Sequence, residues 1–134
     1  MSATDPQWDE ALRWVVKASQ DRRSAVLMLG DDPPLLDPAA YHCQQAAEKL
    51  LKALLAAAGV VIPKSHDLQR LAALVVPLFP ALASAIDPIT DLTPWATATR
   101  YPDLEADLGV MSEDIREALA ALDALHSAVV ALAP

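Results

Sequence analysis

The sequence predicts an all-α protein, an antiparallel up-down bundle of four principal helices with one or two short additional helices. Two observations favour this class. The chain of 134 residues is 54% hydrophobic but only 4% aromatic, and its apolar residues are mostly Ala, Leu and Val, of which Ala and Leu are strong helix formers. Three glycines are too few for a fold rich in tight β-turns, and eleven prolines must mostly punctuate helices. We expect one helical domain over residues 1–134 with one core.

The first helix is expected to begin at Pro6, with Asp5 as its N-cap, and to end near Leu29. Arg22 lies on the apolar face of this helix. There we expect it to pair with an acid or to extend its charged end past the edge of the core, rather than to serve a ligand or an interface. The residues expected on the buried face are Trp8, Leu12, Val15, Ser19, Val26 and Leu29.

The second helix is predicted to follow the proline-rich connection of residues 30–38, with Asp37 and Pro38 repeating the cap-and-proline start. Gly59 is expected to end it in the left-handed conformation. At about 100° per residue, one arc of this helix is apolar and predicted to be buried. That arc carries Cys43, Ala47, Leu50, Leu54 and Ala58, widened by Ala46, Leu51 and Ala57.

A second arc of the same helix carries polar side chains: His42, Gln45, Lys49 and Lys52, flanked by Tyr41 and Glu48. This arc has two interpretations. It is either a solvent-exposed face, with Glu48 and Lys52 paired at i,i+4, or a set of donors that face an anion or a partner subunit.

The third helix is predicted over about residues 66–76, with Ser65 as its N-cap and Asp67 in its first turn. Its apolar face carries Leu68, Leu71, Ala72 and Val75. Prolines then predict a break at Pro77 and Pro80, a short turn or helix over residues 78–86, a short helix within residues 88–97 and a loop over residues 97–103.

The last helix is predicted from a cap at Ser112 to about Leu132, with acidic residues in its first turn. His126 lies within its apolar face and is expected to have a core or interface role rather than a catalytic one. The other members of that face are Ile115, Leu119, Leu122, Val129 and Val130.

Charge and cysteine content limit the function classes. The net charge of −8 argues against broad, non-specific binding of nucleic acid, which needs a basic surface, but not against a local basic pocket. The single cysteine, Cys43, is expected to be an inert buried thiol in a reducing compartment. No secretory signal or membrane span is apparent in the sequence, so we expect a cytoplasmic protein without membrane association.

Common catalytic motifs are absent from the sequence. It has no Gly-rich phosphate loop, no Cys-x-x-Cys pair, no HExxH or i,i+4 histidine pair, and no Gly-x-Ser-x-Gly elbow. We therefore predict no metal site and no cofactor.

Three ordered motifs are specific in another way. The run YHCQQAAEKLLKALLAAAG is followed by IPKSHDLQRL and then by TRYPD. Together they closely resemble the HEPN domain family, in its branch of small stand-alone bacterial and archaeal members, and the resemblance extends from the first helix to the last. It implies a bundle of four to five helices, usually paired as a homodimer, with nucleotide binding and a frequent minimal nucleotidyltransferase partner in toxin–antitoxin-like gene pairs. The positions that match the three motifs are Gln44, Gln45, Glu48, Lys49 and Lys52, then His66, Asp67 and Leu68, then Arg100, Tyr101 and Pro102.

One departure from the family pattern bears on catalysis. Many HEPN proteins are metal-independent ribonucleases that carry an Arg followed after four to six residues by a His on one helix. This sequence has no such pair, because nine residues separate Arg116 from His126. The resemblance therefore leaves two hypotheses: a non-catalytic binding module, or a divergent ribonuclease toxin that uses a set such as His42, Lys49, His66 and Arg100.

For the binding module we expect one mixed cleft. A loop after the third or fourth helix of an antiparallel bundle can return near the start of the second, which would bring Arg100 towards Tyr41 and His42. Lysines and arginine would supply charge-assisted donors for phosphate, and tyrosine a flat face for a base. The alternative is that these side chains only tie loops to the bundle through salt bridges and caps. The predicted ligand-binding residues are Tyr41, His42, Gln45, Lys49, Lys52, His66, Arg100 and Tyr101.

Overall fold

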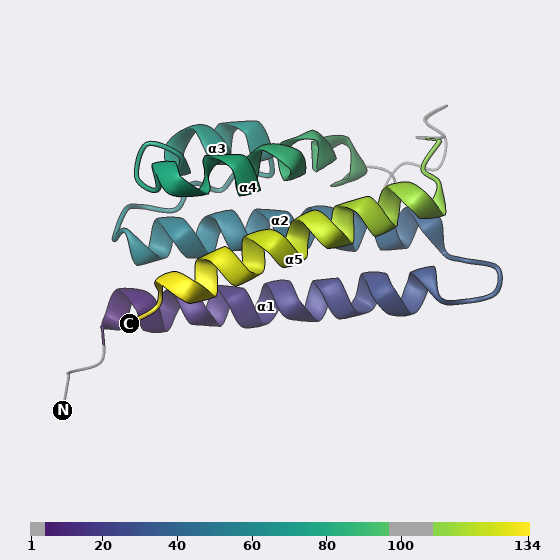
Figure 1. The fold of residues 1–134 in the computed structure, drawn as a ribbon, viewed down its shortest axis with the longest axis horizontal. Helices are drawn as coiled ribbons and strands as arrows, with labels where there is room; N and C mark the ends of the chain where they lie inside the picture. The colour runs from purple at the N-terminus through teal and green to yellow at the C-terminus, as the bar shows by residue number, and fades with distance from the viewer. Residues whose placement is uncertain (1–4, 97–108) are drawn as a thin grey trace.

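The computed structural model describes residues 5–96 and 109–134 (Figure 1). Within these ranges every regular element is helical, which confirms the all-α class. The elements are α1 (Pro6–Leu29), α2 (Leu36–Ala57), α3 (Leu68–Val75), the 3-10 helix η1 (Pro80–Leu82), α4 (Ala83–Ile86), the 3-10 helix η2 (Asp87–Ala96) and α5 (Ser112–Leu132).

The three long helices lie side by side (Figure 1). Helix α2 runs antiparallel to α1, since Trp14 near the start of α1 contacts Lys52 near the end of α2, whereas Asp21 contacts His42. Helix α5 is also antiparallel to α1, because Arg22 pairs with Asp123 and Ser19 contacts His126. The return between α2 and α5 is made by α3, η1, α4 and η2, on the other side of α2 from α1 (Figure 1).

Helix α1 has the predicted bounds and cap. The Asp5 carboxylate accepts hydrogen bonds from the backbone N–H groups of Gln7 and Trp8. The predicted buried face is wrong in part, because Leu12, Ser19 and Val26 are exposed. The buried residues of α1 are Ala11, Val15, Ala18, Asp21 and Ala25. The small buried side chains of α1 let it pack closely against the alanine-rich α2, so close helix contact, rather than side-chain size, selects the buried face.

Helix α2 begins earlier than predicted. Its first residue is Leu36 and its N-cap is Leu35, so Asp37 lies in the first turn and does not cap the helix. The predicted end is confirmed, since Gly59 has a φ of +72°. A Cβ at Gly59 would lie 2.4 Å from Nε2 of Gln7, but that amide ends a flexible side chain and can move, so it is the backbone angle that favours glycine there.

Helix α3 is shorter than predicted. Asp67 is its N-cap and accepts from the N–H groups of Gln69 and Arg70, whereas the Ser65 hydroxyl accepts from Asp67 N–H in the preceding turn. His66 therefore precedes the helix instead of opening it. The predicted apolar face is confirmed, because Leu68, Leu71, Ala72 and Val75 are all buried.

The segment that follows α3 is helical in short pieces, as the prolines predicted. The hydroxyl of Thr93, a residue of η2, accepts a hydrogen bond of 3.0 Å from the N–H of Leu68. This bond connects η2 to the start of α3. The predicted loop of residues 97–103 lies outside the described residues.

Helix α5 has the predicted bounds, but its N-cap is Met111 and Ser112 is its first residue. Met111 N–H donates to the Asp114 carboxylate at 2.8 Å. The expected pairing of Arg22 with an acid is confirmed, because its guanidinium makes two hydrogen bonds to Asp123. This carboxylate raises the pKa of Arg22. Val130, expected on the buried face, is exposed.

The core is centred on α2, whose residues from Leu50 to Ala56 are all buried. Cys43 is fully buried with them, and burial raises the pKa of its thiol to about 12. The thiol is therefore protonated near neutral pH, as the expectation of an inert side chain requires.

Within the described residues, no helix combines the length and apolar character needed to cross a membrane.

Candidate functional site

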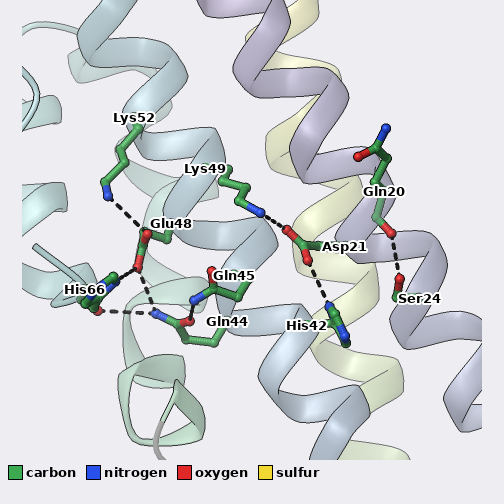
Figure 2. Close-up of polar contacts among 10 residues, drawn as sticks. All are labelled: Gln20, Asp21, Ser24, His42, Gln44, Gln45, Glu48, Lys49, Lys52 and His66. Atoms are coloured by element: carbon green, nitrogen blue, oxygen red, sulfur yellow. Dashed lines mark hydrogen bonds and ion pairs between the residues drawn. The ribbon is translucent and has the colours of Figure 1, made fainter. Parts of the chain in front are cut away.

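Two buried carboxylates organise the polar arc of α2, one from α1 and one from α2 itself (Figure 2). The first is Asp21 of α1. One of its oxygens is 2.8 Å from Nδ1 of His42, and the other accepts from Nζ of Lys49 at 2.5 Å. His42 and Lys49 are two turns apart on α2, so Asp21 joins them across the α1–α2 contact.

The second carboxylate is Glu48, which is 4% exposed. It accepts from Nζ of Lys52 at 3.1 Å, and Nδ1 of His66 lies 2.8 Å from its other oxygen. Lys52 is itself only 7% exposed, and its Nζ lies 5.8 Å from the centre of the Trp14 ring on α1. The ammonium is therefore held between a carboxylate and an aromatic face.

Glutamine side chains extend the Glu48 cluster along α2 (Figure 2). Gln45 Nε2 donates to Gln44 Oε1 at 2.7 Å, and Gln44 Nε2 donates to the His66 carbonyl at 3.2 Å. Gln44 is fully buried, and these bonds satisfy the amide there. Every buried side-chain nitrogen and oxygen in the described ranges has a hydrogen-bond partner.

The structure thus divides the predicted arc into two clusters. The Asp21 cluster contains His42 and Lys49, and the Glu48 cluster contains Gln44, Gln45, Lys52 and His66. Tyr41 lies beside the first cluster, since its ring meets the His42 ring edge-on at 5.3 Å. The predicted pair of Glu48 and Lys52 is confirmed, but a solvent-exposed face is wrong for both residues. Arg100 and Tyr101 lie outside the described residues.

Sequence reasoning missed Asp21 and Trp14 as members of this region. A signal for Asp21 was present, because it interrupts the stripe formed by Ala11, Ala18 and Ala25 on α1. A carboxylate in a stripe of small buried residues requires a donor from the facing helix. Trp14 carried no such signal, since its contact with Lys52 depends on the register between α1 and α2.

The two clusters differ in what they leave accessible. The side chains of His42 and Lys49 are 25% and 24% exposed, and that of His66 is 62% exposed. Each carboxylate therefore lies behind at least one donor that reaches the surface. Among the described residues, no group of three or more His, Cys, Asp or Glu side chains is placed to hold a metal ion.

The model of the HEPN domain family matches residues 11–131. This chain belongs to the HEPN domain family. No curated protein and no solved structure gave a significant match. In this HEPN domain the motif positions on α2 and in the connection to α3 meet around one carboxylate, since Gln44, Lys52 and His66 all contact Glu48. Asp67 of the second motif caps α3.

Proposed function

We propose that this HEPN domain is a non-catalytic module that binds a nucleotide or another phosphate-bearing ligand along the polar arc of α2. The observation that carries the proposal is the placement of Lys49, His42 and His66 in front of buried carboxylates. A lysine ammonium has three N–H donors, and in the described part of the chain Asp21 takes one from Lys49. The carboxylates orient these donors, and a phosphate can accept from the donors that remain.

The proposal includes a homodimer and a minimal nucleotidyltransferase partner in a toxin–antitoxin-like gene pair, both as the family membership implies. We also propose a cytoplasmic location, in keeping with the buried free thiol of Cys43. Light scattering at micromolar concentration tests the dimer, and a monomeric mass would remove it from the proposal. A nucleotidyltransferase reading frame beside the gene would support the partnership.

Calorimetric titration with ATP, GTP and a dinucleotide tests ligand binding. We expect binding by the unmodified chain and weaker binding by Lys49→Ala and Arg100→Ala, because each substitution removes a cationic donor. Arg116→Ala is the matched control, since Arg116 is an exposed cation on α5, a helix that contributes no residue to either cluster. An unmodified chain that binds none of these ligands, or two variants that bind as it does, would contradict the proposal.

The second candidate function, a divergent ribonuclease, is favoured by one observation. Glu48 holds Nδ1 of the exposed His66 at 2.8 Å, an arrangement that fixes an imidazole for proton transfer. We expect no RNA cleavage, because the Arg-to-His spacing of the family nucleases is absent. Metal-independent cleavage of a mixed RNA that disappears in His66→Ala would replace the binding module by the nuclease.

A further inference from the structure

A surface cavity of about 350 Å³ lies on α1, and its walls are Glu10, Arg13, Trp14 and Lys17. We call it the Trp14 pocket. Its four residues recur at the spacing of one helix face, and their exposed surface is mostly apolar, supplied by the Trp14 ring and the aliphatic stems of its neighbours. The volume falls at the lower end of the range for small-molecule sites.

The aromatic wall of the pocket is held in place. Trp14 is partly buried and packs against the hydrophobic core, and the buried Lys52 ammonium lies 5.8 Å from its ring centre. Glu48 in turn fixes Lys52 at 3.1 Å. The core and the Lys52 ammonium therefore orient the ring, whose remaining exposed surface lines the pocket.

The charge of the pocket is opposite to that of the whole chain. Two cations, Arg13 and Lys17, and one carboxylate, Glu10, line the pocket in a protein whose net charge is −8. Both cations are exposed, and within the described residues neither takes part in an ion pair. A flat apolar wall beside two unpaired cations fits a planar aromatic ring that carries an anionic group.

The Trp14 pocket lies on the same side of α1 as Asp21, which belongs to the Asp21 cluster. Asp21 follows Lys17 by four residues and Trp14 by seven, so the three share one side of α1. Seven residues of helix correspond to about 10 Å, a length that an extended nucleotide can span from its base towards Lys49.

We propose that the Trp14 pocket is the base-binding half of the nucleotide site. The base stacks on Trp14, and Arg13 and Lys17 bind the phosphate next to the ribose. This inference rests on the proposed nucleotide-binding function and names the ligand as a mononucleotide. Stacking on an indole accepts any base, so the pocket selects nucleotides by ring and charge rather than by hydrogen bonds to base edges.

Calorimetry with AMP, adenosine and inorganic phosphate tests this assignment. The unmodified chain is expected to bind AMP more tightly than either fragment. Trp14→Ala should weaken AMP binding roughly tenfold or more, which corresponds to about 1.4 kcal/mol, whereas Trp14→Phe should retain most of the affinity. The double variant Arg13→Gln/Lys17→Gln should bind AMP no better than adenosine. This double variant keeps the core intact, because both side chains are exposed.

Two controls separate this inference from the proposed function. Arg23→Gln removes an exposed cation from α1 outside the pocket, and Trp95→Phe alters a partly buried tryptophan on η2. Both variants should bind AMP as the unmodified chain does.

If the unmodified chain binds nucleotide and both Trp14→Ala and the double variant match it, the pocket assignment is wrong and the proposed function stands. If the unmodified chain binds no nucleotide, the proposed function fails and the pocket assignment fails with it. A change in molar mass by light scattering in the double variant would make the pocket a subunit contact and overturn the assignment.

Discussion

Replacement of Glu48 by alanine is expected to lower the free energy of unfolding by about 3–5 kcal/mol, because the substitution leaves the Lys52 ammonium buried without its carboxylate. Lys52 is 7% exposed and Glu48 is 4% exposed, so water can do little to replace the lost contact. The Gln44 amide also loses an acceptor. Urea denaturation of the variant and the unmodified chain, followed by circular dichroism, measures the difference.

Charge and shape can be separated at this site. Glu48→Gln keeps the shape but removes the charge, and we expect it to destabilise the protein. Adding Lys52→Met to Glu48→Gln should recover a large part of that loss, because no buried charge then remains unpaired. A double variant that is no more stable than Glu48→Gln would show that the ion pair is not the cause.

Asp21→Ala provides a comparison with the other carboxylate. Its partners His42 and Lys49 are about one quarter exposed, so water can solvate them after the carboxylate is removed. We therefore expect a smaller loss than for Glu48→Ala. Equal losses would mean that solvent access does not set the cost at these two sites.

Leu54→Ala is expected to lower the free energy of unfolding by about 2–5 kcal/mol, through lost burial and the cavity that the substitution leaves. Leu54 is fully buried on α2, at the centre of the bundle. Leu27→Ala is the matched control, since the same atoms are removed from a side chain that is 64% exposed. Its effect should lie within about 0.5 kcal/mol.

Urea denaturation of both leucine variants checks this prediction. If Leu27→Ala cost as much as Leu54→Ala, the exposed face of α1 would be buried in solution, for instance against a second copy of the chain. Similar small effects from both variants would contradict the position of α2 at the centre of the core.

Helix termini show where local sequence signals compete. The Asp5 cap was predictable because Asp5 directly precedes Pro6, and proline is favoured at the first position of a helix. Before α3, Ser65 and Asp67 both offer a side-chain acceptor, and Asp67 is the N-cap. The N–H of the next residue, Leu68, donates to the hydroxyl of Thr93 on η2. That contact joins residues 25 positions apart, so no local pattern contained it.

The sequence by itself determined the all-α class, the extents of α1 and α5 to within a residue, the apolar arc of α2 and the membership of the HEPN family. These follow from helix periodicity, proline positions and short motifs, all of which are local. It also placed His42, Gln45, Lys49 and Lys52 on one arc.

Only the tertiary structure decided how that arc is used. Asp21 of α1 contacts His42 and Lys49. The α2–α3 connection places His66 against Glu48, and the Trp14 ring of α1 lies near the Lys52 ammonium. The buried face of α1 was decided in the same way, by the alanines that allow close approach to α2. The physical reason is that periodicity fixes the angle of a side chain around its own helix, whereas the partner at that angle depends on the register between helices that are far apart in the chain.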